Sequence, residues 1–250
     1  MLRRYGPTAL LLAAMVALWQ GVASLGSVDD LTLASPVETA RALNDDASLL
    51  FDNALTTLVE VLLGLAIAVA LGAGAAIAMH LKRSVREAAY PLLIASQAVP
   101  IVVVAPLLIL MFDYGIGPKI AIVALICFFP VTVNLLDGLR SVEPELLKLM
   151  RSLGASRLAT LWKVELPSSL PFLFSGLKIA ATVSVIGAVF GEWAGADEGL
   201  GRLVLLGLTQ LETPRVYAGV VLLSLMALAL FVAVVLLERA LVPWKREARA

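Results

Sequence analysis

The chain has 250 residues, of which 60% are hydrophobic and 15% are charged, and its mean hydropathy is +0.96. Soluble domains carry about a quarter charged residues, so this composition excludes an ordinary soluble protein and predicts a polytopic membrane protein. Because 19 basic residues balance 19 acidic ones, no global field favours nucleic acid or another highly charged partner. The single cysteine, Cys127, lies in an apolar run and is expected to pack there.

Six apolar segments approach the length of about 20 residues that a helix needs to cross a bilayer. In chain order they are residues 7–25, 55–79, 90–111, 120–136, 172–193 and 216–237. We therefore predict an all-α fold, a single transmembrane domain over residues 1–250 with about six membrane-spanning helices. The first segment also resembles a signal peptide, because two arginines precede it and small residues follow it. We expect this segment to be retained, whereas its cleavage would leave five spans.

Basic residues gather on one side of these segments. They lie at both chain ends, between the second and third segments and between the fourth and fifth. By the positive-inside rule, both termini and the loop between the fourth and fifth segments are expected in the cytoplasm.

That loop contains a polar, basic insert, residues 143–171, with the sequence EPELLKLMRSLGASRLATLWKVELPSSLP. A proline flanked by glutamates predicts the start of one helix, Gly154 predicts its left-handed end, and Ser156 predicts the cap of a second helix. Pro167 and Pro171 are expected to end the second helix and to redirect the chain into the fifth segment. On local grounds the insert either packs on the protein's own cytoplasmic face or docks another protein.

Ionisable groups within the apolar segments are functional candidates, because a charge inside a bilayer is costly unless it is paired or hydrated. Glu60 lies in the second segment and Glu192 at the outer end of the fifth. Glu60 either lines a path or pairs with a basic group on another span, whereas Lys178 is expected to snorkel to the cytoplasmic surface. The third segment holds three prolines, including Pro100, with Gln97 nearby. Such a helix faces a hydrated path or is a kinked packing helix.

Several chemistries lack their residues in this sequence. There is no G-x-x-x-x-G-K-[ST] phosphate loop, no Cys and His cluster with zinc spacing, and one histidine only, His80. We therefore expect no catalysis, no metal site and no cofactor bound by this chain. A short apolar piece, residues 203–211, cannot cross the bilayer and is expected at the outer interface or as a gate.

The positions of Gly154-Ala155, Val164 and Leu166-Pro167 resemble the EAA loop of ATP-binding-cassette importer permeases, here residues 138–171. The resemblance extends from residue 55 to residue 244. It is carried also by SQAVPIVVVAPLLILMFDYGIG, GAVFGEWAGADEGLG and LETPRVYAG, which are similar to permeases for sulfonates, taurine, nitrate and thiamine-pyrimidine precursors. One departure is that Lys148-Leu149-Met150 replaces the usual glutamate followed by two alanines.

The resemblance implies a type I importer transmembrane domain in the bacterial inner membrane. It implies partners as well: two ATPase subunits that bind the ATP, a second permease copy that forms a homodimer with this chain, a periplasmic or lipid-anchored solute-binding protein, and membrane lipid. The residues expected to couple to the ATPase are Glu145, Lys148, Arg151, Gly154, Ala155, Arg157, Leu166 and Pro167. Those expected along the translocation path are Glu60, Gln97, Pro100 and Glu192.

The expected solute is a small organic nutrient, either a pyrimidine thiamine precursor, a riboflavin-like molecule or a sulfonate. A second hypothesis is an ion- or proton-coupled secondary transporter that acts without an ATPase and uses Glu60 and Glu192 as relay carboxylates. A scaffold or an intramembrane enzyme is a third, and the sequence offers it no catalytic set.

Overall fold

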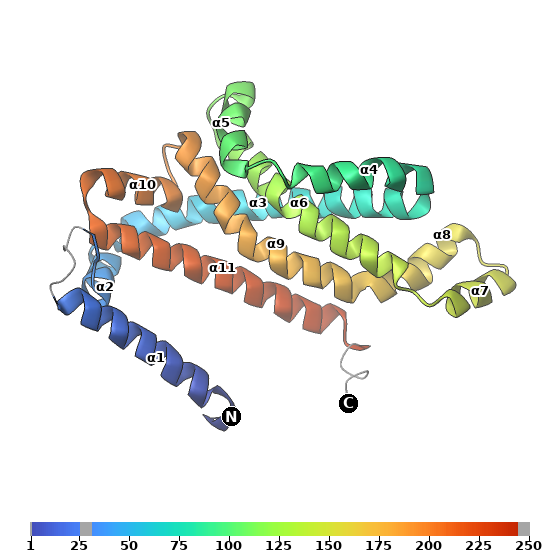
Figure 1. Ribbon diagram of the computed structural model, residues 1–250, viewed down its shortest axis with the longest axis horizontal. Coiled ribbons are helices and arrows are strands. Elements are labelled where there is room, and N and C mark those ends of the chain that lie inside the picture. Colours follow the sequence, from blue (N-terminus) through green and yellow to red (C-terminus); the bar gives the residue numbers. More distant parts are fainter. Residues whose placement is uncertain (1, 26–31, 245–250) are drawn as a thin grey trace. The chain divides into compact units, whose positions relative to one another are not determined.

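The computed structural model describes residues 2–25 and 32–244, and every regular element in these ranges is helical (Figure 1). The elements are α1 (Leu2–Ser24), α2 (Pro36–Asp45), α3 (Ala47–Leu81), α4 (Arg83–Ser96), α5 (Ile101–Phe112), α6 (Ile116–Arg140), α7 (Pro144–Ser152), α8 (Arg157–Thr160), the π-helical turn η1 (Leu161–Glu165), α9 (Leu166–Gly195), α10 (Leu200–Gln210) and α11 (Thr213–Leu241). The predicted all-α fold is confirmed.

Four helical segments in the described ranges are long and apolar enough to cross a membrane. They are Ala47–Leu81, Ile116–Arg140, Arg157–Gly195 and Thr213–Leu241. The first expected span lies in α1, whose apolar stretch Leu10–Ser24 is shorter.

The third expected span, residues 90–111, is not one helix. Helices α4 and α5 together are apolar enough to span, but they are bent by 102° at the break between Ser96 and Ile101. Proline explains the position of the break, because Pro100 has no N–H to donate and disfavours helical geometry at the residue before it. Pro91 and Pro106 lie inside α4 and α5 respectively without ending either helix.

The chain forms two compact units. One comprises Met1–Thr57 with Asp197–Ser224, and the other comprises Leu58–Ala196 with Leu225–Ala250. Helices α3 and α11 contribute residues to both units. The single-domain prediction for residues 1–250 remains a prediction.

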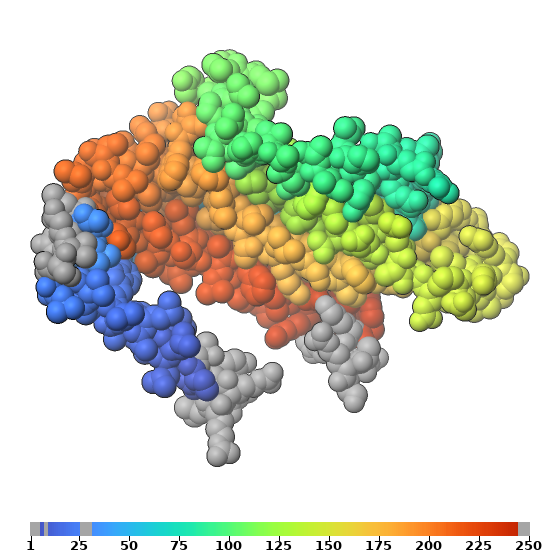
Figure 2. All heavy atoms as spheres, in the orientation of Figure 1, coloured from blue at the N-terminus to red at the C-terminus, as the bar shows by residue number. Residues whose placement is uncertain are grey.

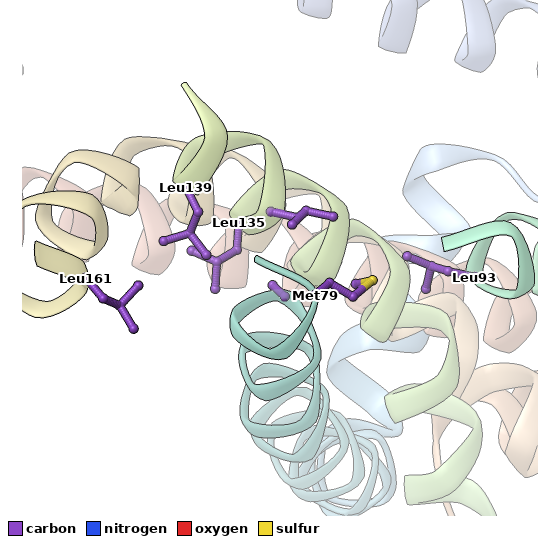
Figure 3. Packing of buried hydrophobic residues seen from close by; sticks show 7 residues of the cluster. Met79, Leu93, Leu135, Leu139 and Leu161 are labelled. Carbon is purple, nitrogen blue, oxygen red and sulfur yellow. The ribbon is translucent and has the colours of Figure 1, made fainter. Parts of the chain in front are cut away.

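In the larger unit, α6 and α9 pack closely along much of their length. Glycines make this approach close: a Cβ on Gly176 would lie 2.5 Å from the Pro130 carbonyl oxygen, and one on Gly191 would lie 3.1 Å from the Lys119 Cα. Small residues at helix contacts let backbones approach in this way inside membranes. A separate apolar cluster joins α3, α4, α6 and η1 through Met79, Leu93, Leu135, Leu139 and Leu161 among others (Figure 3).

In the smaller unit, polar contacts fix the short helices. The Trp19 indole donates to the Ala34 carbonyl oxygen at 3.0 Å and stacks on Tyr217. Ser35 and Glu38 form a capping box at the start of α2, so two backbone N–H groups at this helix end are satisfied. Arg215 donates to Asp46 at 2.7 Å.

Candidate functional site

The insert folds as a helical hairpin, as its local signals predict. Helix α7 starts at Pro144, and Gly154 takes a left-handed conformation with φ +74° after its end. The Ala155 N–H donates to the Met150 carbonyl oxygen at 3.0 Å, which closes the turn. Ser156 then caps α8 by accepting from the Ala159 N–H at 3.2 Å. The predicted helix, glycine turn and serine cap are confirmed.

The predicted end of the second helix is wrong. Helix α8 passes through the π turn η1 directly into α9, so Arg157–Gly195 is one continuous helical segment. The π turn pairs the Leu166 N–H with the Leu161 carbonyl oxygen. Because its backbone is wider than an α-helix, Pro167 is accommodated as the second residue of α9 instead of ending the helix. Pro171 lies inside α9.

The first half of the insert exposes its apolar residues, whereas Leu161 further along the insert is buried against α3, α4 and α6. Helix α7 has no buried residue. Its turn and the following helix expose large apolar side chains, including Leu153 at 72% and Trp162 at 67%, together with Leu149 and Leu158. In Figure 2 the insert, coloured yellow to yellow-green, forms a projection of this unit. The insert thus packs on its own protein in part, through Leu161, and docking of another protein on its exposed apolar side chains remains a prediction.

The residues expected to couple to an ATPase divide into two groups in the structure. Glu145, Lys148, Arg151 and Gly154 are exposed on the hairpin, and Ala155 is half-buried in its turn. Leu166 and Pro167 are also half-buried, at the start of α9. Arg157 keeps 47% of its side chain exposed, and its Nη1 donates to the buried Glu165 Oε1 at 2.5 Å. The structure brings Arg157 together with an internal partner, and its role towards an ATPase stays a prediction.

Sequence reasoning missed Glu165, which has only 1% of its surface exposed. His80, near the end of α3, lies with its Nε2 3.1 Å from Glu165 Oε2 and 2.7 Å from Arg157 Nη2. The signal was present in the sequence as an acidic residue between Val164 and Leu166, in an otherwise basic stretch. Its partner His80 is 85 residues away, and nothing local indicates that separation.

Glu60 has a buried basic partner from another span. The Lys119 ammonium of α6 donates to Glu60 Oε1 of α3 at 2.5 Å, and the two side chains are 9% and 0% exposed. Glu192 of α9 is also fully buried and interacts with the Glu60 carboxyl. Three helices thus place ionisable groups at one point inside the larger unit. Of the two alternatives for Glu60, the structure shows the pairing with a basic group.

Gln97 and Pro100 lie at the break between α4 and α5, and both are exposed. Beyond the break, α5 presents large apolar side chains to its surroundings, among them Leu107, Leu110 and Met111. The path role of Gln97 and Pro100 remains a prediction.

The Lys178 ammonium pairs with the carboxylate of Glu238, which lies near the end of α11. Snorkelling of Lys178 to the cytoplasmic surface remains a prediction. This pair joins α9 to α11 within the larger unit.

The short apolar piece after α9 is helix α10, and α3 fixes its first turn. The Gly199 N–H donates to Asn53 Oδ1 at 2.7 Å, and the Leu200 N–H donates to Thr57 Oγ1 at 2.9 Å. These side chains satisfy N–H groups that have no partner within the helix. At 11 residues, α10 is too short to cross a bilayer.

Known proteins share the sequence pattern and the helical fold of this chain. Residues 66–247 match the model of the binding-protein-dependent transport system inner membrane component family. The chain belongs to this family of transport permeases, whose members are inner-membrane components of ATP-binding-cassette transporters. A solved structure titled as an amino acid ABC transporter with histidines shares the fold, with a TM-score of 0.61 at 18% identity, over 86% of this chain and 99% of that one.

Three curated relatives match nearly the whole chain. The formylaminopyrimidine transport permease protein ThiX of Halalkalibacterium halodurans is 38% identical, covering 96% of both chains. The riboflavin transport system permease protein RibX of Chloroflexus aurantiacus is 37% identical, covering 96% of this chain and 89% of its own. The taurine transport system permease protein TauC of Escherichia coli is 32% identical, covering 95% and 89%.

Proposed function

We propose that this chain forms the solute path of an ATP-driven importer and is moved by a separate ATPase that docks on the insert. The observation that carries the proposal is the hairpin α7–α8, which exposes Leu149, Leu153, Leu158 and Trp162 at the end of the continuous segment Arg157–Gly195. Exposed apolar side chains rimmed by charges are typical of a protein-docking surface. Because the hairpin continues into a span without a break, a displacement of the hairpin would reach the membrane part directly.

The proposed arrangement places both termini and the insert in the cytoplasm, in accordance with the basic residues on that side. Two ATPase subunits would bind the ATP, so the chain itself would need no cofactor and would perform no catalysis. A second permease copy would cover the apolar side chains of α5, and a solute-binding protein would deliver solute on the outer side. Lipid would cover the remaining apolar surface.

For the solute, we propose a pyrimidine precursor of thiamine as the first candidate. Support comes from the relative named for formylaminopyrimidine transport, which aligns over 96% of both chains. The relatives named for riboflavin and taurine make these solute classes the comparison compounds.

The proposal is tested by reconstituting the chain in proteoliposomes with the ATPase and the binding protein encoded beside it. We expect uptake of the solute to require ATP and the binding protein. Uptake driven by an ion gradient without either partner would instead establish the secondary transporter. The ligand of the binding protein, measured by calorimetry against the three compound classes, identifies the solute.

Within that assay, Gly154 tests the docking role. No atom lies within 4 Å of a Cβ built on Gly154, but its φ of +74° disfavours other residues by about 1–2 kcal/mol. Gly154→Glu, which adds bulk, charge and this strain, is expected to lower ATP-driven uptake while the protein still inserts into the membrane. Gly154→Asn is the matched control, because asparagine tolerates the left-handed region, and it should retain most of the uptake. Normal uptake with Gly154→Glu would contradict the docking role.

A further inference from the structure

A buried carboxylate lies where the insert joins the membrane part. Glu165 is the last residue of the π turn η1, and 1% of its surface is exposed. Its two oxygens have different partners: Oε1 accepts from Arg157 Nη1 at 2.5 Å, and Oε2 lies 3.1 Å from His80 Nε2. A carboxylate buried with partners on two other elements ties those elements together.

The two partners belong to opposite sides of this junction. Arg157 is the first residue of α8 and thus part of the insert, whereas His80 is in the last turn of α3, which is a membrane span. Glu165 therefore contacts both the hairpin and the end of α3, and His80 also contacts Arg157 directly. Apolar packing joins the same elements, because Leu161 of η1 lies in one cluster with Met79 of α3 (Figure 3).

His80 Nε2 has two alternative partners, whereas Arg157 reaches Glu165 through a separate nitrogen, Nη1. His80 Nε2 lies within hydrogen-bonding distance of the Glu165 carboxylate and also of Arg157 Nη2, at 2.7 Å. With a proton on Nε2 the ring donates to Glu165, and without that proton it accepts from Arg157, so Nε2 serves one of them at a time. The bond across the junction can be exchanged without separating Arg157 from Glu165.

The π turn itself supports a role in movement. Single π turns inside long helices are frequent at functional sites, and this one lies between the docking hairpin and the span α9. Its geometry places Glu165 on the side of α3 and holds the chain continuous through Pro167.

We propose that Glu165 is the positioning residue that transmits movement of the insert to α3, with His80 as its exchangeable partner. This inference rests on the proposed function, since it needs an ATPase to move the insert. Movement of the insert would then reach the membrane part in two ways. It would act on α9 through the continuous helical segment, and on α3 through the buried carboxylate of Glu165.

The test compares Glu165→Gln and His80→Gln with wild type in the reconstituted importer, measuring solute uptake and ATP hydrolysis together. We expect both variants to assemble and to hydrolyse ATP, with uptake per ATP hydrolysed lowered by about tenfold, which lies within the usual range of coupling between linked sites. Glu87→Gln is the matched control. Glu87 pairs with Arg83 at 2.7 Å on α4, but the pair is exposed and joins no other element.

A merely structural role for Glu165 would lower assembly and ATP hydrolysis together and leave uptake per ATP unchanged. That outcome overturns the proposal, as does wild-type uptake per ATP in His80→Gln, a substitution that leaves Arg157 and Glu165 paired. Failure of the proposed function has a separate signature, because wild type itself would then show no ATP-dependent uptake, and the inference would fall with it.

Discussion

The buried pair of Lys119 and Glu60 allows a quantitative prediction, because removing one partner should cost much more stability than removing both. Lys119→Met removes the ammonium and leaves the Glu60 carboxyl fully buried without its basic partner. Breaking a buried ion pair in this way costs about 3–5 kcal/mol. For a chain of this length, that corresponds to a fall of roughly 10 °C in unfolding temperature.

The double variant Lys119→Met with Glu60→Gln removes both charges and keeps similar volumes. Replacing a whole buried pair by uncharged groups is often close to neutral, so we expect the double variant to recover most of the loss, to within about 2 kcal/mol of wild type. Wild type, Lys119→Met, Glu60→Gln and the double variant form a double-mutant cycle. Each is heated in detergent, and the fraction of protein that remains monodisperse is measured. Lys178→Met is a comparison, since its pair with Glu238 is more exposed and should cost less.

The same variants separate the two roles of Glu60. If Glu60 and Lys119 only hold α3 against α6, the stable double variant should still import solute at near the wild-type rate. Loss of uptake in a double variant that remains stable would show that the pair acts in transport and would contradict a purely structural role for Glu60. A double variant no more stable than Lys119→Met would refute the energetic argument.

Two further predictions concern packing and pH. Gly176→Ala should destabilise the larger unit by about 1–3 kcal/mol in the same detergent assay, because its Cβ would lie 2.5 Å from a carbonyl oxygen of α6. Gly74→Ala is the control: its Cβ would have no atom within 4 Å, so this variant should be neutral or gain up to about 1 kcal/mol. Equal effects of the two substitutions would contradict the close approach of α6 and α9. The pKa of Glu38 is held below its usual value because the Ser35 backbone N–H and hydroxyl donate to it, so the capping box contributes fully above the usual pKa and is lost as the pH falls through the lowered one. Amide exchange in α2 should therefore accelerate in that acidic range relative to neighbouring helices, and Glu38→Gln should abolish this pH dependence.

Local chemistry accounts for what could be predicted from the sequence. The start of α7, the left-handed Gly154 and the cap at Ser156 each depend on interactions within five residues, and all three lie where the sequence places them. The break after Ser96 follows from Pro100 in the same way, although its angle of 102° does not. Span positions follow from length and hydropathy, which need no knowledge of packing.

Pairings across the fold could not be predicted in this way. Glu60 and Lys119 are both conspicuous in an apolar sequence, but their contact depends on how α3 and α6 pack over a separation of 59 residues. The error at Pro167 has a related cause. The rule that proline ends a helix assumes regular α geometry, and the π turn before Pro167 contacts distant elements through Leu161 in the apolar cluster and through Glu165 at His80. Such contacts are absent from any local pattern.

The residues that resemble the family loop differ in their surroundings, and this difference suggests what the replacement of the usual glutamate by Lys148 changes. Lys148 is exposed on α7, so its substitution changes the surface offered to a partner and no internal contact. Arg157, by contrast, binds the buried Glu165, and Pro167 follows the π turn. We therefore expect an exchange of Lys148 for glutamate to alter the affinity for the ATPase, while uptake per ATP hydrolysed by assembled complexes stays unchanged. Changes at Arg157 should show the opposite pattern.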